Sequence, residues 1–249
     1  MSLDRMPVYA VLGATGGIGS LLARRLAEQG AHLALAARGE DRLRVLGEEL
    51  GAFTMQVDAT QIESVDAYIQ NVVETYGQVD GIVNCVGSIL LKPAHLTSEE
   101  EWRSTIAQNL DSAFAVVRAA GRSMRRNGGV VVLLASAVAR VGLSNHESVA
   151  AAKSGVIGLA RSAAATYASK GIRFNVVSPG LVQTPMSERI TSNEASRKLS
   201  ESLHALGRLG EPDDIVSMIL WLLDLKNDWV TGQVFGVDGG LGTIRAYVR

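Results

Sequence analysis

A group of glycines near the start of the sequence has the spacing of a phosphate-binding turn. The apolar run Val8–Leu12 leads directly into residues 13–19, which read Gly-Ala-Thr-Gly-Gly-Ile-Gly, and an amphipathic pattern follows. Glycine lets the backbone approach a pyrophosphate closely and adopt conformations that other residues resist. The N-terminus of a following helix would present free N–H groups and partial positive charge to the phosphates. The segment therefore predicts a dinucleotide site, with an empty tight turn as the alternative.

The end of the second apolar run indicates which dinucleotide binds. NAD-binding proteins with such a turn usually carry an acidic residue there, about 20 residues past the glycines, which accepts a hydrogen bond from the ribose 2′-hydroxyl. Here the position holds Ala37, followed by Arg38. An arginine can bind a 2′-phosphate through a planar, charged pair of hydrogen bonds. We therefore expect NADP(H), with NAD(H) as the alternative, because Glu40 and Asp41 could hold Arg38 in a surface ion pair.

The glycine spacing and several later segments resemble the short-chain dehydrogenase/reductase family over residues 7–240. The turn has the spacing Gly-x-x-x-Gly-x-Gly, at Gly13, Gly17 and Gly19. The later similar segments are, in order, Asn84-Cys85-Val86-Gly87, Asn109-Leu110, Ser136, Ala150-Ala151-Ala152-Lys153-Ser154-Gly155-Val156, Ser178-Pro179-Gly180, Thr184-Pro185-Met186, Gly232-Gln233 and Val237-Asp238-Gly239-Gly240. The resemblance implies a nicotinamide dinucleotide and hydride transfer between the nicotinamide and a carbonyl or alcohol carbon.

The resemblance also implies which residues bind the cofactor. They are Gly13, Thr15, Gly16, Gly17, Ile18, Gly19, Arg38, Asp58, Asn84, Gly87, Lys153, Pro179, Gly180, Val182 and Thr184. Asp58 is implied as the adenine partner, with a helix cap as an equal alternative role. Lys153 would bind the nicotinamide ribose, and the segment from Pro179 to Thr184 corresponds to the one that folds over the nicotinamide.

The family's proton-transfer residues are matched at three positions and missing at a fourth. In the family a tyrosine hydroxyl donates the proton, and a lysine one helical turn later lowers the pKa of that tyrosine. An earlier serine bonds the substrate oxygen, and an asparagine holds a relay water. The resemblance implies Asn109, Ser136 and Lys153 for these last three roles, but residue 149, four before Lys153 and thirteen after Ser136, is a valine. Tyr167 has the wrong spacing from Lys170, and we expect it to be a packing residue.

His146 is the candidate for the missing proton donor. It lies three residues before Val149 and seven before Lys153, so the three side chains share a face if the helix begins early. An imidazole titrates near neutral pH and is a competent general acid. A solvent-exposed loop position is the alternative for His146. Three interpretations stay open: an oxidoreductase with a substituted donor, a slow oxidoreductase that relays protons through Lys153 and water, or a catalytically impaired NADP-binding scaffold or sensor.

A parallel sheet would bring these residues together. Apolar runs predict strands at Val8–Leu12, His32–Ala37, Phe53–Val57, Gly81–Cys85, Val130–Ala135, Arg173–Val177 and Gln233–Val237. Most are continuously apolar, which is typical of strands buried on both faces. Amphipathic stretches predict helices at Ile18–Gln29, Arg42–Leu50, Ile62–Tyr76, Glu99–Arg126, Val149–Ser169 and Asp213–Leu223. The alternation predicts an α/β fold, a single doubly wound Rossmann-type domain with a seven-stranded parallel sheet.

Local signals mark the ends of these elements and one insertion. Thr97 followed by Glu100 predicts a capping box, and four glycines stand where helices should stop, at Gly30, Gly51, Gly77 and Gly171. Residues from about 184 to 209 are polar and weakly patterned. We expect them to form a substrate-loop insertion in the single domain, residues 1–249.

The composition argues against several classes of partner. The net charge is −1, so we expect neither nucleic acid nor a membrane surface as partner. The resemblance implies a small carbonyl or alcohol compound as substrate. A single cysteine, Cys85, and the lack of a CxxC pair predict no disulfide and no metal site. The most apolar stretch, Ile215–Leu223, is about half of a membrane span. Met1–Arg5 lacks the apolar region of a signal peptide, so we expect a cytoplasmic protein.

The two longest predicted helices resemble those that form the family's homotetramer interface. We therefore expect a homotetramer or homodimer. Small and branched residues would suit close packing between subunits, although core burial explains them as well; they are Val116, Val117, Ala119, Ala120 and Ala163 to Ala165.

Overall fold

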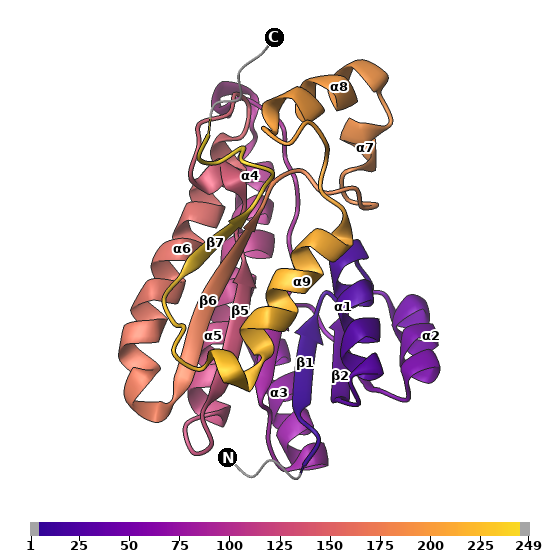
Figure 1. The fold of residues 1–249 in the computed structure, drawn as a ribbon, viewed down its shortest axis with the longest axis vertical. Coiled ribbons are helices and arrows are strands. Elements are labelled where there is room, and N and C mark those ends of the chain that lie inside the picture. Colours follow the sequence, from indigo (N-terminus) through magenta and orange to yellow (C-terminus); the bar gives the residue numbers. More distant parts are fainter. Residues whose placement is uncertain (1–4, 245–249) are drawn as a thin grey trace.

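A seven-stranded parallel sheet forms the centre of the protein in its computed structural model, which describes residues 5–244 (Figure 1). The strand order is β3-β2-β1-β4-β5-β6-β7. The strands are β1 (Val8–Leu12), β2 (His32–Ala37), β3 (Phe53–Gln56), β4 (Gly81–Asn84), β5 (Gly129–Leu134), β6 (Ile172–Pro179) and β7 (Val234–Val237). The predicted α/β fold with a seven-stranded parallel sheet is confirmed. Residues 1–4 lie outside the described residues, and with them most of the segment Met1–Arg5 that lacks the apolar region of a signal peptide.

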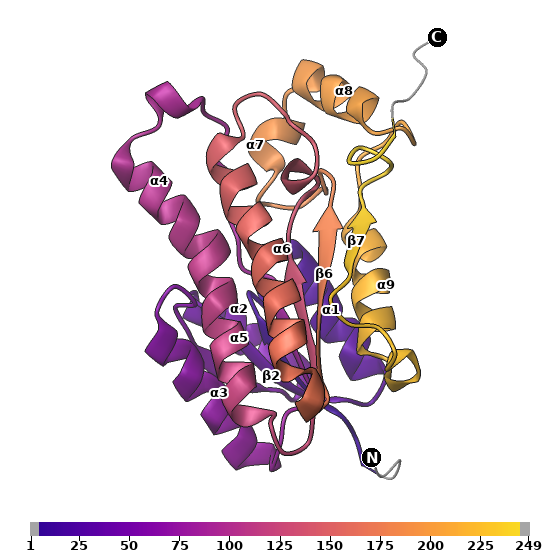
Figure 2. The same cartoon turned by 90° about the vertical axis from the view of Figure 1, so that its left-hand side faces the viewer.

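Helices cover both faces of the sheet, as Figure 2 shows. One face packs against α1 (Gly17–Glu28), α2 (Glu40–Leu50) and α9 (Pro212–Leu223). The other packs against α3 (Ile62–Tyr76), α5 (Ser112–Ser123) and α6 (Glu147–Tyr167). Alternate residues of β1 enter the two cores, Ala10 on one side and Val11 on the other. Burial on both faces explains why the strands are continuously apolar.

Shorter helical segments complete the fold. They are α4 (Glu99–Ile106), α7 (Glu188–Thr191), α8 (Glu194–Leu203), a π-helical segment at Ala107–Asp111, and short 3-10 turns at Ala94–Leu96, Ala137–Ala139, Ala168–Lys170 and Leu225–Asn227. Both α7 and α8 lie above the carboxyl ends of the strands (Figure 1). The segment from about 184 to 209, which is polar and weakly patterned in the sequence, thus contains two helices.

The ends of several helices are set by left-handed glycines. All four glycines predicted to stop a helix have positive φ, for example Gly51 at 60° and Gly77 at 81°. The predicted capping box is wrong by one residue, since Ser98 and Glu101 form it. The Glu101 N–H donates to the Ser98 hydroxyl (3.1 Å), whereas the Thr97 hydroxyl donates to the Pro93 carbonyl. Thr97 is thus engaged by the preceding turn and does not cap the helix.

The predicted helix over residues 99–126 is interrupted. The π-helical segment Ala107–Asp111 separates α4 from α5 and widens the helix where Asn109 lies. A π-bulge of this kind inserts an extra residue in a turn and is frequent at functional sites. The interruption matters here because it changes the direction of the Asn109 side chain relative to an unbroken helix.

The small residues considered for a subunit interface lie mostly inside the monomer. Val116, Ala119 and Ala120 are fully buried in the core between α5 and the sheet, and Ala163 and Ala164 are also buried. Val117 is buried as well, whereas Ala165 is exposed, so core burial accounts for all of these side chains except Ala165. Within residues 5–244, no helix combines the length and the apolar character needed to cross a membrane.

Candidate active site

The glycine turn follows β1 at the centre of the sheet. It lies where β1 and β4 are neighbours and the connections leave in opposite directions, the usual place for a ligand in such a fold. Gly13 has a φ of +74°, and a Cβ atom there would lie 2.9 Å from the Cys85 carbonyl carbon. A Cβ on Gly19 would lie 2.3 Å from the Gly13 carbonyl oxygen. Glycine is therefore required at both positions by the packing of the turn.

The helix after this turn offers unpaired donors. The N–H groups of Gly17, Ile18 and Gly19, the first three residues of α1, have no hydrogen-bond acceptor within residues 5–244. No acidic residue lies in the first turn of α1. The helix dipole and these free N–H groups favour an anion such as a phosphate.

The turn faces the segment that follows β6. A Cβ on Gly17 would lie 2.8 Å from Cγ2 of Thr184, so the lack of a side chain at Gly17 lets the two segments come together. The Thr184 N–H donates to the Ser187 hydroxyl (3.0 Å), which shapes the start of this segment. Residues far apart in the sequence therefore meet above β1.

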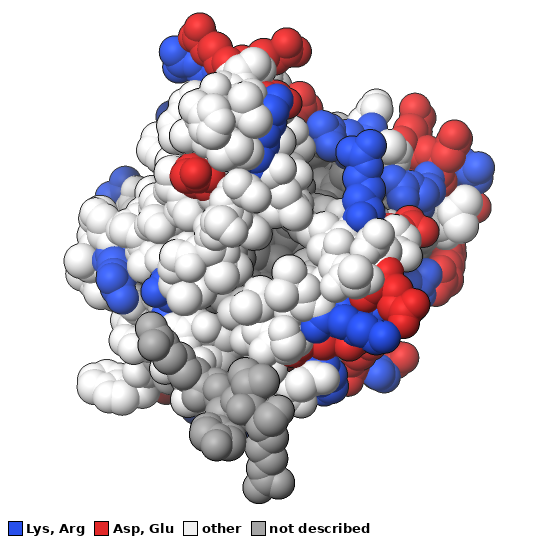
Figure 3. Space-filling view, turned by 90° about the horizontal axis from the view of Figure 1, so that it is seen from above, with Lys and Arg blue, Asp and Glu red and all other residues white. Residues whose placement is uncertain are grey.

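A long groove of about 380 Å³ extends from this meeting point along the carboxyl edge of the sheet. Ten of the residues implied for cofactor binding line it: Gly13, Thr15, Gly16, Gly17, Ile18, Gly19, Arg38, Asp58, Gly87 and Thr184. Seen onto this edge, the middle of the face is hollowed, and Lys and Arg side chains stand beside the hollow (Figure 3). The groove is long and glycine-rich, which suits a dinucleotide.

Two arginines lie at the far end of the groove. Arg38 and Arg42 both line it and are exposed, and within the described residues neither Glu40 nor Asp41 pairs with Arg38. Sequence reasoning missed Arg42, although it lies four residues after Arg38. Asp58 also lines the groove, and its Oδ1 accepts from the Thr60 N–H (3.0 Å) and hydroxyl (2.8 Å). Asp58 does not cap α3, because the residue before that helix is Gln61.

A second pocket, of about 140 Å³, continues from the groove toward the interior. Asn109, Ser136 and Lys153 line it, from the π-helical segment, the end of β5 and α6. The other predicted residues lining it are Ile18, Gly87, Pro179, Gly180, Val182 and Thr184. Ile18, Gly87 and Thr184 belong to both spaces, so groove and pocket form one continuous site.

Asn109 is held rigidly by its neighbours. Its Oδ1 accepts from the Ser88 N–H (3.1 Å), and its Nδ2 donates to the Ser88 hydroxyl (2.9 Å) and the Thr105 carbonyl (2.9 Å). A Cβ on Gly87 would lie 3.0 Å from Asn109 Oδ1 and 3.3 Å from Lys153 Nζ. Because Gly87 has no side chain, the Asn109 amide and the Lys153 ammonium can both border the space beside it.

Lys153 is buried and only 6% exposed. Its Nζ donates to the Leu134 carbonyl (2.8 Å). Burial lowers the pKa of this ammonium to about 8, because desolvation penalises the charged form. Cys85 lies nearby and lines both spaces, and burial raises the pKa of its thiol to about 12. The thiol is therefore neutral, and Lys153 can exchange a proton near physiological pH.

Ser136 lies where the second pocket meets a third, of about 160 Å³. Its Oγ accepts from the Val138 N–H (3.4 Å), and within residues 5–244 its hydroxyl proton is donated to no acceptor. The hydroxyl can therefore donate to a ligand oxygen. Val149, 5% exposed, lines both pockets, one helical turn before Lys153 on α6. No tyrosine lines either pocket among the described residues.

His146 lies at the mouth of the third pocket. It is the residue that precedes α6, so it flanks the helix and is not part of it. It lines the third pocket together with Ser136 and Val149, whereas Lys153 lines the second. The His146 Nδ1 lies 2.7 Å from the Ser144 carbonyl oxygen. Because a carbonyl only accepts, Nδ1 carries a proton, and Nε2 is left for other partners.

Two of the residues considered from the sequence lie away from these spaces. Asn84, 3% exposed, lines neither the groove nor the second pocket; its Oδ1 accepts from the Val86 N–H (3.1 Å) and its Nδ2 donates to the Ser112 hydroxyl (3.3 Å). Asn84 thus shapes the segment that ends at Gly87. Tyr167 is a packing residue, as expected, with its ring 5.7 Å from that of Phe174. No group of three or more metal-binding side chains occurs within residues 5–244.

Known proteins resemble this chain over nearly its whole length. A family profile described as enoyl-(acyl carrier protein) reductase matches residues 13–242. A 3-oxoacyl-[acyl-carrier-protein] reductase of Thermotoga maritima is 33% identical over 242 residues, with 94% of this chain and 97% of the relative covered. The corresponding reductase of Vibrio cholerae is 32% identical over 237 residues, covering 94% and 96%.

Solved structures agree with the sequence relatives. A short-chain type dehydrogenase/reductase from Mycobacterium ulcerans has a TM-score of 0.92 at 29% identity, covering 96% of this chain and 91% of the other. A variant of an actinorhodin polyketide ketoreductase with NADPH has a TM-score of 0.90 at 30% identity, covering 98% and 100%. A nicotinamide cofactor is therefore expected, and the glycine turn with its free N–H groups fits one. The chain belongs to the short-chain dehydrogenase/reductase family of oxidoreductases.

Proposed function

We propose that this chain is an NADP(H)-dependent oxidoreductase that transfers hydride between nicotinamide and a carbonyl or alcohol carbon, with a proton donor other than tyrosine. One observation carries the proposal. Asn109, Ser136 and Lys153 come from three separate elements and line a single pocket that is continuous with the glycine-rich groove. Ser136 is the member of this group that has no structural or cofactor-binding role of its own, and its free hydroxyl supports a role toward a substrate oxygen.

Each polar residue of the pocket has a separate role near the substrate oxygen. The Ser136 hydroxyl, which has no acceptor within the described chain, donates a hydrogen bond to that oxygen. Lys153 supplies positive charge beside the pocket and binds the ribose of the cofactor. Asn109 holds the Ser88 backbone and thereby the shape of the segment after Gly87. A bound nicotinamide supplies or accepts the hydride, so the protein has only a proton to move.

His146 is proposed as the group that moves this proton. Its Nδ1 proton is directed to the Ser144 carbonyl, which orients the ring, and it lines the same pocket as Ser136. A histidine can act as a general acid through Nε2. Lys153 is the competing proton source, because its pKa of about 8 lies near neutrality.

The preference for NADP(H) is supported by the charge at the far end of the groove. Arg38 and Arg42 are both free of ion pairs within residues 5–244 and both line the groove, while Ala37 offers no side-chain acceptor to a ribose hydroxyl. Two guanidinium groups favour a 2′-phosphate over a 2′-hydroxyl. One of the similar structures was determined with NADPH.

The proposed substrate is a small carbonyl or alcohol compound with an apolar substituent. The third pocket is lined mainly by aliphatic side chains, among them Ile89, Leu91, Leu143, Ile190 and Leu203. Two of the similar proteins are named as reductases of 3-oxoacyl groups and a third as a ketoreductase. A ketone with its apolar part in this pocket would place its oxygen near Ser136.

We also propose that residues 1–249 form one domain, with the segment at about 184–209 acting as a substrate loop. We further propose that the protein is cytoplasmic and works as a homotetramer or homodimer. In support of self-association, two aromatic side chains are exposed along α4 and α5, Trp102 at 39% and Phe114 at 46%. Size-exclusion chromatography with light scattering tests the assembly, and a monomer would contradict it.

Deuterium transfer tests the function directly. NADPH and NADH binding are first measured by titration, and a panel of ketones is then offered with NADPH deuterated at C4 of the nicotinamide. We expect deuterium at the former carbonyl carbon of a product. If the cofactor binds and no ketone acquires deuterium, the protein is a cofactor-binding scaffold, the alternative that Val149 at the wall of the pocket favours.

A further inference from the structure

A buried histidine that lines the third pocket also joins two segments that enclose this pocket. His204 follows α8 directly and is only 3% exposed. Its Nε2 accepts a hydrogen bond from the Leu181 N–H (3.1 Å), in the segment after β6. Its Nδ1 lies 2.7 Å from the Ser200 carbonyl oxygen on α8. Since a backbone N–H only donates and a carbonyl only accepts, the ring must be neutral, with its proton on Nδ1.

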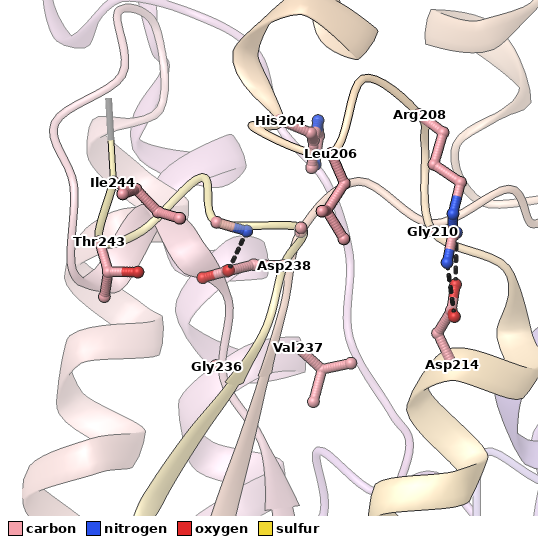
Figure 4. Close-up of a pocket in the computed structure, with 13 residues that line it drawn as sticks. His204, Leu206, Arg208, Gly210, Asp214, Gly236, Val237, Asp238, Thr243 and Ile244 are labelled. Atoms are coloured by element: carbon pink, nitrogen blue, oxygen red, sulfur yellow. Dashed lines mark hydrogen bonds and ion pairs between the residues drawn. The ribbon is translucent and has the colours of Figure 1, made fainter. Parts of the chain in front are cut away.

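Two neighbouring glycines leave the space that the His204 ring occupies, and a side chain at either position would crowd it. A Cβ on Gly180 would lie 2.5 Å from His204 Nε2, and a Cβ on Gly239 would lie 3.3 Å from its Cβ. Figure 4 shows His204 at the edge of a pocket that also contains Asp238 and the Arg208–Asp214 ion pair. The ring is therefore packed between the loops that follow β6 and β7.

The two segments that the His204 ring connects line different pockets. Leu181 follows Gly180, which lines the pocket of Ser136 and Lys153. On the other side, Leu203 directly precedes His204 and contributes to the apolar third pocket with Ile190. Outside its bond to His204, α8 has few anchors: none of its residues is fully buried. The His204 imidazole thus holds the apolar wall of the third pocket in place relative to the pocket that contains Ser136 and Lys153.

We propose that His204 is a positioning residue: its neutral ring fastens α8 to the segment after β6 and so sets the affinity for the substrate. Without the Nε2 acceptor the Leu181 N–H would lose its partner, and the connection would open. The proposal deepens the function proposed above and depends on it for the kinetic measurement only.

Other titratable groups near the ring do not have this arrangement. Asp238 accepts from the backbone N–H groups of Gly240 (3.0 Å) and Gly242 (3.2 Å). The remaining charged or titratable groups on the surrounding elements are Arg140 near Gly236, Arg208 paired with Asp214, Glu201 paired with Arg197 and Glu194 paired with Lys198 on α8, Glu188 and Arg189 on α7, and His146 across the third pocket. None of these groups forms a hydrogen bond with the His204 ring within residues 5–244.

Two substitutions separate the ring's role as an acceptor from its volume. His204→Gln can place an amide oxygen near the position of Nε2, whereas His204→Leu fills space and accepts nothing. Hydrogen exchange of peptides containing Leu181 and α8 is measured at pH 8 for the wild type and both variants, so that the intrinsic exchange rate cancels.

At pH 8 we expect the wild type and His204→Gln to exchange alike, with His204→Leu about threefold to tenfold faster in both peptides, the effect of one lost hydrogen bond. The KM for the ketone should follow the same order, while kcat changes less than KM. A peptide from α2 serves as the unaffected control.

Exchange in His204→Leu that matches the wild type in both peptides would overturn the proposal. If His204→Leu does not fold, a His204→Gln protein that exchanges at least about threefold faster than the wild type in both peptides would overturn it. Neither comparison requires turnover. A protein that shows the exchange pattern but no deuterium transfer to any ketone would refute the proposed function and leave the role of His204 intact.

Discussion

The Lys153 ammonium donates a hydrogen bond of 2.8 Å to the Leu134 carbonyl, at the point where β5 ends and α6 passes over it. The strand thus places the charge beside the pocket, and the surrounding apolar side chains exclude water from it. Burial lowers the pKa of Lys153 to about 8 from an ordinary 10.5. Burial of the Lys153 charge lowers the free energy of unfolding. We infer that the charge is kept because it lies beside the pocket.

This cost predicts a pH-dependent gain in stability for Lys153→Met. Because the folded pKa is the lower one, the unfolded chain binds more protons between pH 8 and 10.5, and the penalty is fully present below pH 8. We expect the variant to be more stable than wild type at pH 7 by about 1–3 kcal/mol. The advantage should shrink as the pH rises toward 10.5. Urea unfolding of both proteins at several pH values checks this, and a pH-independent difference would contradict it.

The arginines at the end of the groove predict cofactor preference. Arg38→Ala should weaken NADPH binding by about 1.5–3 kcal/mol, the contribution of a hydrogen bond to a charged group, and leave NADH binding nearly unchanged. Arg42→Ala should act in the same direction, because both side chains line the groove. Calorimetric titration with both cofactors measures the effects. Equal affinity of the wild type for NADPH and NADH would refute the preference.

A methyl group at Gly87 should disturb both polar residues of the second pocket. The added Cβ would lie 3.0 Å from Asn109 Oδ1 and 3.3 Å from Lys153 Nζ, closer than ordinary contacts. We expect Gly87→Ala to lower kcat/KM by at least about tenfold, since small displacements of positioned groups reduce rates strongly. Gly142→Ala is the matched control, because a Cβ there meets nothing within 4 Å. Equal loss in both variants would point to a general effect on folding.

The sequence predicted those parts of the fold that depend on local patterns. The bounds of β1, β2 and α3 agree residue by residue with their predicted ranges. The buried strands have a continuous apolar signal, and left-handed glycines mark the helix ends, so both can be recognised without a structure. The capping box shifted by one residue because Thr97 and Ser98 are both suitable caps, and only the preceding turn decides between them.

The site was predictable where a motif carried it and not where distant segments meet. The glycine turn and the grouping of Asn109, Ser136 and Lys153 followed from spacing and resemblance. The contacts of Gly17 with Thr184 and of His204 with Leu181 join residues that no local pattern relates. The π-helical segment at Asn109 also has no signature in amphipathic periodicity, which predicted one unbroken helix.

The position of Val149 predicts a gain of activity. Val149→Tyr would add a phenol beside Ser136, and Lys153 one turn away should favour the phenolate. We expect NADPH-dependent reduction of a reactive diketone to appear or increase, at a stability cost below about 1–3 kcal/mol. Val149→Phe, which has the ring without the hydroxyl, is the control and should show no gain. The gain should disappear when Lys153→Ala is added. A folded Val149→Tyr protein that matches Val149→Phe would show that the pocket does not use a phenol.

The most direct test of the proposed proton donor compares the turnover rate of the wild type with that of His146→Ala. The central claim is that a side chain at the mouth of the third pocket supplies the proton that residue 149 cannot. Steady-state reduction of one ketone with saturating NADPH should slow about 10²–10⁴-fold in His146→Ala, the usual contribution of a general acid. NADPH affinity should not change, because His146 does not line the groove. Undiminished turnover in His146→Ala would contradict the claim and assign the proton to Lys153 and water.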